Sequence, residues 1–169
     1  MVVEKGKVWK MGHDIDTDQI YPGRYLGITD PSEIGQYAMK GLIVDFHYQI
    51  QNEEVIIVAG RNFGCGSSRE HAAIALKEAG VKAVIAESFG RIFFRNSINL
   101  GLPAVECPEI LDLVDDGDEL EIRLKNGKID NITKKKTYEV NILPDAVAEI
   151  MFGGGLIEYY RKKIELKEM

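Results

Sequence analysis

The sequence predicts an α/β fold in which a parallel βα centre is combined with antiparallel hairpins, and three observations carry this prediction. Residues 54–106 alternate short β-branched apolar runs with stretches of helical apolar spacing, a pattern typical of consecutive βα units. Residues 119–142 contain strand-like runs around Asn126-Gly127, a strong hairpin signal. The 169 residues, 45% of them hydrophobic, suffice for one core and show neither a repeat nor a linker. We therefore expect residues 1–169 to form a single domain.

The first third of the chain is expected to contain one strand, a long loop and one helix. Residues 2–9 alternate roughly in polarity, which predicts a strand. Residues 11–18 are rich in aspartate and poor in apolar side chains, which indicates a loop. A helix is predicted over 31–40, with Asp30 as its N-cap and Glu33 completing a capping box.

The middle of the chain predicts two helices between three strands. The run Val55-Ile-Ile-Val58 suits a strand that is buried on both faces, and a glycine-rich turn at 60–68 follows it. Strands that are linked through helices in this way run parallel, with right-handed crossovers. The expected strands are 54–59, 81–86 and 103–106, and the expected helices are 69–79 and 90–100.

The last third predicts a hairpin followed by helices. Three glycines, Gly153–Gly155, separate two stretches of helical spacing, so these are expected to be two helices. The expected strands are 119–124, 128–133 and 137–142, and the expected helices are 144–151 and 156–164.

Composition and charge exclude several classes of function. The formal net charge is −6 and no basic stripe stands out, which argues against a nucleic-acid-binding surface. Residues 1–10 lack the apolar core of a signal peptide, and no apolar run has the length of a membrane span. The two cysteines, Cys65 and Cys107, are too few for a disulfide framework. We therefore expect a cytoplasmic protein that binds neither nucleic acid nor membrane.

The segment 62–71, Asn-Phe-Gly-Cys-Gly-Ser-Ser-Arg-Glu-His, has the features of an anion-binding turn. Gly64 and Gly66, on either side of Cys65, let the backbone adopt positive φ and come close to a ligand. The free N–H groups at the start of the following helix favour an anion, and the Arg69 guanidinium matches a carboxylate. The hydroxyls of Ser67 and Ser68 lie beside it in the sequence.

A small carboxylate is the anion that this segment suits. A Walker A loop requires a lysine that is absent, and Arg69 occupies the third glycine position of a dinucleotide fingerprint. The G-x-S-x-G pattern of a nucleophile elbow is also absent. The alternative is that Ser67 and Glu70 only form a capping box, which would require neither two glycines nor an arginine. His71 is expected to orient a neighbour by hydrogen bonding, and His13 and His47 are expected to be solvated.

Several long motifs resemble small subunits of the aconitase superfamily. They are the segment 62–71, the opening at 8–24 (Val-Trp-Lys-Met-Gly-His-Asp-Ile-Asp-Thr-Asp-Gln-Ile-Tyr-Pro-Gly-Arg), the segment 86–102, and Gly153–Gly155 with Leu156. They occur in order and span nearly the whole chain. Small subunits of 3-isopropylmalate dehydratase, and next those of archaeal-type homoaconitase, are most similar in length and pattern.

The resemblance implies a swivelling β/β/α domain that docks on a large subunit, as a heterodimer or heterotetramer. The resemblance also implies that three cysteines of that partner hold a [4Fe-4S] cluster. The two cysteines of this chain, Cys65 and Cys107, are consistent with this division, since they are too few to hold a cluster themselves. The implied activity is that of a hydro-lyase, which interconverts 2- and 3-isopropylmalate in leucine biosynthesis by dehydration and rehydration. The alternatives are a homoaconitase, a 2,3-dimethylmalate dehydratase, or a carboxylate-binding regulatory module without catalysis.

The resemblance also implies roles for particular residues. By motif position Ser67 resembles the catalytic base and Asp18 an acidic active-site residue. Ser68 and Arg69 resemble ligands of a substrate carboxylate.

The resemblance implies that substrate choice depends on the loop formed by Tyr25, Leu26, Gly27 and Ile28, and Arg24 directly before it is a further candidate for binding substrate. Gly27 stands where homoaconitase-like members carry arginine and many isopropylmalate isomerases an apolar residue. The missing charge favours an alkyl-substituted dicarboxylate, since a buried carboxylate without a partner is costly. Arg24 lies three residues away and offers an alternative partner for a tricarboxylate.

Overall fold

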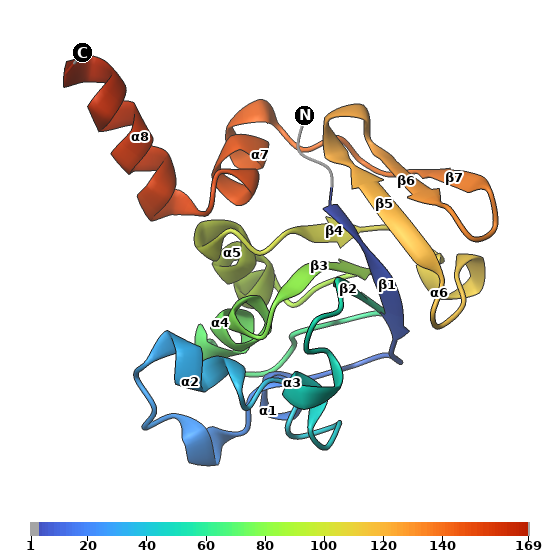
Figure 1. Cartoon of the computed structure of the whole chain (residues 1–169), viewed down its shortest axis with the longest axis horizontal. Coiled ribbons are helices and arrows are strands. Elements are labelled where there is room, and N and C mark those ends of the chain that lie inside the picture. Colours follow the sequence, from blue (N-terminus) through green and yellow to red (C-terminus); the bar gives the residue numbers. More distant parts are fainter. Residues whose placement is uncertain (1–3, 169) are drawn as a thin grey trace.

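A computed structural model describes residues 4–168, which form one seven-stranded mixed sheet in the order β4-β3-β2-β1-β5-β6-β7 (Figure 1). Strand β1 is the junction, because it pairs in parallel with β2 on one side and antiparallel with β5 on the other. The predicted combination of a parallel centre and antiparallel hairpins is therefore confirmed. The parallel strands are β1 (Glu4–Lys10), β2 (Val55–Ala59), β3 (Val81–Ala86) and β4 (Ala104–Glu106). The antiparallel strands are β5 (Glu119–Arg123), β6 (Lys128–Asn131) and β7 (Lys136–Glu139).

The core has two parts, one on each face of the sheet, and β2 contributes to both. All five residues of β2 are buried. Because side chains alternate along a strand, Val55 and Ile57 pack into one cluster while Ile56 and Val58 pack into the other. This double burial explains why the sequence of β2 is apolar throughout, with no polar alternation.

Helices α4 (His71–Glu78) and α5 (Arg91–Leu100) cover the first face, together with α2 (Pro31–Gly35) (Figure 1). The second cluster lies between the parallel strands, the antiparallel strands and the short helix α6 (Ile110–Leu113). Small side chains on α4, among them Ala72 and Ala73, are fully buried and let the helix pack closely on the sheet.

The chain ends with α7 (Asp145–Phe152) and α8 (Leu156–Glu168). Met151 of α7 is buried, and its Sδ accepts the Ala104 N–H at 3.2 Å, which ties α7 to β4. Gly155 lies so close to the end of α5 that an added Cβ would be 2.4 Å from the Asn99 carbonyl oxygen. Helix α8 extends away from the body (Figure 1), and none of its described residues is buried.

The predicted helix over 31–40 is wrong in length. It ends at Gly35, and turns follow as far as the short helix α3 (Phe46–Gln49). Asp30 is its N-cap, but its side chain accepts the N–H of Ser32 at 2.9 Å, so the capping box with Glu33 does not form. The strand predicted at 2–9 is β1, with residues 2 and 3 outside the described residues.

Three further short elements differ from the sequence prediction. Residues 17–20, expected to be loop, form helix α1 (Thr17–Ile20), and α3 and α6 were not expected. A 3-10 turn, η2 (Leu124–Asn126), precedes Gly127 in the predicted hairpin between β5 and β6, and Gly127 has a φ of +60°.

Candidate functional site

The residues singled out by the sequence lie in loops that follow β1 and β2. These strands are neighbours and parallel, so both loops leave the same edge of the sheet. The loops remain paired beyond the strands. Gly64 donates its N–H to the Ile15 carbonyl oxygen at 2.7 Å, and Thr17 donates its N–H to the Cys65 carbonyl oxygen at 2.8 Å. This pairing holds the aspartate-rich loop against the glycine-rich turn.

Two glycines of the turn have the positive φ that the sequence predicts. Gly64 has a φ of +78° and Gly66 a φ of +108°. A Cβ on Gly64 would lie 2.2 Å from Cγ of Phe93, and one on Gly66 would lie 3.1 Å from Oγ1 of Thr17. Gly64 is therefore required by both conformation and space, and Gly66 lets Thr17 come close to the turn.

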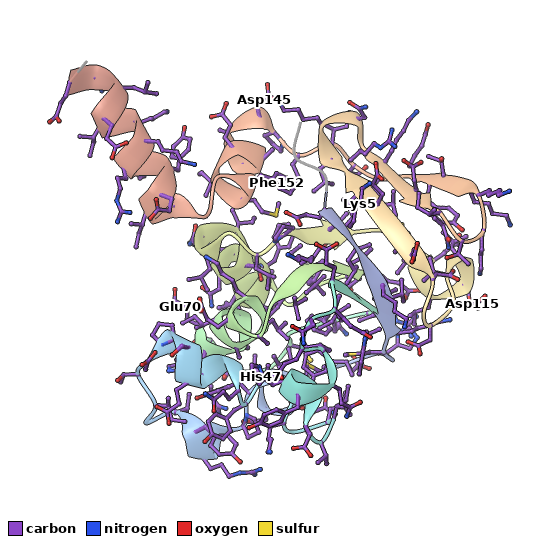
Figure 2. The ribbon with its side chains drawn as sticks, in the orientation of Figure 1. Lys5, His47, Glu70, Asp115, Asp145 and Phe152 are labelled. Carbon is purple, nitrogen blue, oxygen red and sulfur yellow. The ribbon has the colours of Figure 1, made fainter. Side chains whose placement is uncertain are left out.

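The predicted start of the following helix is wrong. Helix α4 begins at His71, and its N-cap, Glu70, makes no side-chain capping bond within the described residues. Figure 2 shows Glu70 at the outer side of the molecule beside α4. The capping box between Ser67 and Glu70 is therefore absent, and residues 67–70 form an irregular segment between the turn and the helix.

The Ser67 hydroxyl instead faces Thr17. Its Oγ lies 3.1 Å from Oγ1 of Thr17, and the same Oγ1 accepts the Ser67 N–H at 3.1 Å. Thr17 is 2% exposed, whereas Ser67 and Ser68 are exposed. Ser67, the serine predicted to act as a base, is thus exposed to solvent, and the buried Thr17 hydroxyl contacts it from the protein interior.

Arg69 and Asp18 form an ion pair between Nη1 and Oδ1. The Arg69 side chain is 25% exposed and that of Asp18 is 65% exposed, so the pair lies at the surface. Only one of the guanidinium nitrogens carries this bond, and a guanidinium has five N–H donors. Arg69 can therefore bind a further carboxylate without leaving Asp18.

The segment directly before the loop expected to select the substrate is firmly packed, and it holds the start of that loop. Ile20 and Tyr21 are fully buried, and Tyr21 donates its hydroxyl to the Tyr25 carbonyl oxygen at 2.7 Å. The ring of Tyr25, in the 3-10 turn η1 (Gly23–Tyr25), stacks on Tyr37 with 4.2 Å between ring centroids. The Arg24 guanidinium lies over the Tyr25 ring, 4.8 Å from its centroid.

Gly23, just before this loop, lies next to the turn, whereas Gly27 within the loop faces open space. A Cβ on Gly23 would lie 3.4 Å from Nη1 of Arg69, so the loop runs beside the Asp18–Arg69 pair. A Cβ on Gly27 would meet nothing within 4 Å in the described part of the chain. Leu26 and Ile28 are half-buried against the first core cluster, while Gly27 is exposed. The predicted residues of the loop and of the turn are therefore brought to one edge of the molecule.

Comparisons with known proteins show the family to which this chain belongs. The model of the aconitase C-terminal domain family matches residues 4–109, more than half of the chain. The chain is 55% identical over 160 residues to the 3-isopropylmalate dehydratase small subunit of Methanosarcina acetivorans, covering 95% of this chain and 98% of that protein. It belongs to the aconitase C-terminal domain family, among the 3-isopropylmalate dehydratase small subunits.

Two further relatives come from Methanocaldococcus jannaschii. An isopropylmalate/citramalate isomerase small subunit is 51% identical over 160 residues, covering 95% of each chain. A crystal structure described as 3-isopropylmalate dehydratase (leuD) superposes with a TM-score of 0.90 at 43% identity, covering 99% of this chain and 98% of that one. The predicted resemblance and the fold that it implies are therefore confirmed.

Both cysteines of this family member are free thiols. Burial raises the pKa of the Cys65 thiol, and the carboxylates of Asp16 and Asp14 raise it further. Burial also raises the pKa of Cys107 to about 11, with a contribution from Glu87. Within residues 4–168 no three His, Cys, Asp or Glu side chains are grouped so that they could hold a metal ion. The described residues therefore do not fit an iron–sulfur cluster.

The three histidines lie in different surroundings. His71 stacks on the ring of Tyr21, with 5.5 Å between ring centroids, so it packs against the segment that precedes the substrate loop. His13 was expected to be solvated, and its side chain is 41% exposed; its Nδ1 also accepts the Arg61 N–H at 2.9 Å and lies 3.7 Å from Oε2 of Glu87. Nδ1 of His47, also expected to be solvated, is buried without a hydrogen-bond partner among the described residues.

Two further residues at this edge, Thr17 and Ser88, were not predicted from the sequence to belong to the site. Ser88 follows β3, and its Oγ accepts the Asn62 N–H at 2.9 Å, which anchors the turn to a third loop at the same edge. Thr17 lies inside the motif 8–24, yet only the structure brings its hydroxyl to Ser67.

Among the helices of residues 4–168, none is long and apolar enough to span a membrane.

Proposed function

We propose that this chain is the small subunit of a hydro-lyase that interconverts 2-isopropylmalate and 3-isopropylmalate by dehydration and rehydration. The observation that carries the proposal is the meeting of Ser67, Arg69 and Asp18 at one open edge, in a chain similar over nearly its whole length to small subunits of that name.

In this proposal Ser67 is the base that removes the proton next to a carboxylate of the substrate. Arg69 binds that carboxylate through its free N–H donors, and Ser68 assists with its hydroxyl. Asp18 fixes the direction of the Arg69 guanidinium through the ion pair. The backbone of Gly64, Cys65 and Gly66 holds Ser67 at the edge of the turn. A serine acts as a base only where its ionised oxygen is stabilised, so its neighbours matter as much as the residue itself.

A large subunit completes the site in this proposal. Ser67 and Ser68 are exposed, which leaves one side of a bound substrate open to a partner. The partner would carry the [4Fe-4S] cluster, which as a Lewis acid would polarise the leaving hydroxyl of the substrate. Heterodimer and heterotetramer are both compatible with this division. The two free cysteines favour a reducing cytoplasm as the location.

The loop 24–28 favours an alkyl-substituted dicarboxylate. The open space at Gly27 accommodates an alkyl group, and Arg24 lies beside Tyr25 instead of occupying the position of Gly27. A citramalate isomerase is the second candidate, because a relative of 51% identity is named for both substrates. Homoaconitase and 2,3-dimethylmalate dehydratase activities are further alternatives, and for a tricarboxylate Arg24 would have to turn towards the site.

The test is an activity assay of the purified chain with and without a cluster-bearing large subunit. The complex is expected to hydrate isopropylmaleate, and the unsaturated diacid formed by dehydration of citramalate, faster than homoaconitate. The isolated chain is expected to be inactive. Ser67→Ala should lower kcat by about 10²–10⁴-fold while KM changes little. Ser32→Ala, on α2, is the matched control and should retain full activity.

Two results would overturn the proposal. Faster hydration of homoaconitate would contradict the assignment of substrate. Carboxylate binding by the complex without any turnover would support a regulatory module instead. The formal charge of −6 gives no support to a role in nucleic-acid binding.

A further inference from the structure

Thr17, whose hydroxyl contacts Ser67, is held in place by its backbone hydrogen bonds and by its burial. Thr17 is the first residue of α1, and its backbone N–H donates to the Cys65 carbonyl oxygen at 2.8 Å. Its own carbonyl oxygen accepts the Tyr21 N–H at 2.8 Å. The helix start is capped by Asp16, whose side chain and that of Gln19 form a complete capping box. Since Thr17 is also 2% exposed, its hydroxyl has little freedom to move.

The hydrogen bonds around this hydroxyl determine which way its proton points. A threonine hydroxyl has one proton to donate and two lone pairs that accept. One lone pair of Oγ1 accepts the Ser67 N–H, at 3.1 Å. The second contact recorded for Oγ1, also at 3.1 Å, is with Ser67 Oγ. When Ser67 is ionised its oxygen has no proton to give, so the bond can form only with Thr17 as donor.

We propose that Thr17 is a positioning residue that donates its hydroxyl hydrogen bond to the ionised Ser67 oxygen and so holds it as a base. This inference rests on the proposed function. The buried donor satisfies one side of the charge, and the other side of Ser67 remains open for substrate.

The neighbouring glycine leaves the space for this arrangement. A Cβ on Gly66 would be 3.1 Å from Thr17 Oγ1, which is tighter than ordinary contact. Any side chain there would press on the hydroxyl that meets Ser67. Gly66 is therefore needed for the Thr17–Ser67 contact as well as for its own positive φ of +108°.

The proposed transfer of a proton from substrate to Ser67 does not involve the hydroxyl proton of Thr17. The substrate C–H bond breaks and its proton moves to Ser67 Oγ. The electron pair of that bond forms the C=C bond while the neighbouring C–O bond breaks and hydroxide leaves. In the return step, hydroxide adds to one carbon of the C=C bond while Ser67 gives its proton back to the other carbon, which leaves Ser67 ionised again. Thr17 keeps its own proton, accepts from the Ser67 N–H throughout and donates to Oγ whenever Oγ is ionised.

The test compares Thr17→Val, which keeps the shape and removes the hydroxyl, with Thr17→Ser, which keeps the hydroxyl. In the reconstituted complex Thr17→Val should lower kcat by about 10²-fold, in the range measured for loss of one oxyanion donor, with KM within about threefold of wild type. Its pH–rate profile should move to higher pH, because ionised Ser67 loses a donor. Thr17→Ser should keep at least about a third of the wild-type kcat and the wild-type pH profile.

A merely structural role would lower thermal stability and complex formation without moving the pH profile, and that result would overturn the inference. A wild-type pH profile in Thr17→Val, or a Thr17→Ser variant as slow as Thr17→Val, would overturn it as well. Thr17→Ala supplies a second variant without the hydroxyl if valine prevents folding, and it should show the same shift. If the wild-type complex turns over none of the substrates, the proposed function is wrong. If the wild-type complex is active and the Thr17 variants are as active as wild type, the proposed function stands and only the inference about Thr17 is wrong.

Discussion

Gly64 holds the turn after β2 in a conformation that other residues rarely adopt. Its φ is +78°, and Phe93 of α5 packs directly against its Cα. The turn at Gly64 also donates to Ile15 and so connects the two loops of the site. A side chain at this position would disturb both the turn and the packing of α5.

We predict that Gly64→Ala lowers the free energy of unfolding by about 2–5 kcal/mol. The left-handed conformation costs an alanine about 1–2 kcal/mol, and forcing a methyl group into a packed core typically costs about 1–3 kcal/mol more. The measurement is urea unfolding followed by circular dichroism. Gly27→Ala is the matched control. Its φ lies outside the left-handed region and a Cβ there would meet nothing within 4 Å of the described residues, so its effect should be a few tenths of a kcal/mol. Equal losses in the two variants would contradict this account.

At the scale of elements, Asp118 joins the turn before β5 to β6. It is 5% exposed, and its Oδ2 accepts the Asp115 N–H at 2.9 Å and the Asn131 side-chain N–H at 2.7 Å. Lys134 Nζ lies 3.7 Å away. Burial tends to raise the pKa of Asp118, but these hydrogen bonds and Lys134 outweigh it, so the pKa is lowered. Figure 2 shows Asp115 at the outer end of the same turn.

The lowered pKa of Asp118 determines how the stability of the fold should depend on pH. A carboxylate whose pKa is lower in the folded state adds stability above its unfolded pKa of about 3.9, and this stability is lost as the pH falls through the folded value. We predict that Asp118→Asn lowers the free energy of unfolding at pH 7 by about 1.5–3 kcal/mol, typical of a hydrogen-bonded buried charge. Measured by urea unfolding, the difference from wild type should shrink in acid below about pH 4. Asp112→Asn, at an exposed position of α6, should show no such pH-dependent difference. A loss that is the same at both pH values would count against this explanation.

The elements that the sequence predicts well are those whose patterns depend on local burial. Strand β3 has the predicted bounds and β2 differs by one residue, because residues buried on both faces must be apolar throughout. The hairpin at Gly127 is predicted correctly because its turn requires a positive φ.

Capping motifs are predicted less well, because their side chains have other partners. The boxes expected at Asp30 and at Ser67 do not form, whereas Asp16 and Gln19 form one that was not considered. Asp30 instead binds the N–H and hydroxyl of Ser32, and Ser67 binds Thr17, which is 50 residues away in the sequence. A local pattern carries no information about such a distant partner. For the same reason the motifs pointed to Ser67 and Arg69 but not to Thr17.

At the scale of the whole molecule, the C-terminal helices differ in how they are attached. Helix α7 contributes Met151 to the core and to a bond with β4, whereas α8 buries none of its described residues. Ile157, Ile164 and Leu166 on α8 are 75%, 57% and 73% exposed. Most of the stability of the fold should therefore lie before α8.

We predict that deleting residues 157–169 lowers Tm by no more than about 4 °C, since a change of 1 kcal/mol shifts Tm by about 2–4 °C in a chain of this size. Deleting residues 145–169 removes Met151 as well, and a lost buried methionine side chain alone costs about 2–5 kcal/mol. Differential scanning calorimetry of both truncated chains measures the two effects. If the shorter deletion is as damaging as the longer one, α8 is part of the stable core.

The parallel pairing of β1 with β2 has a consequence for folding order. The two strands are separated in the chain by 44 residues, 11–54, which must fold back before the pair can form. Closing so long a loop costs conformational entropy that local turns avoid, and contacts between distant parts of a chain generally slow folding. The Thr17–Ser67 bond spans this same closure. We therefore expect the hydrogen bonds between Thr17 and Ser67 to be absent from partly folded chains. A partner that binds the edge of the molecule formed by these residues should then bind only chains that have completed folding.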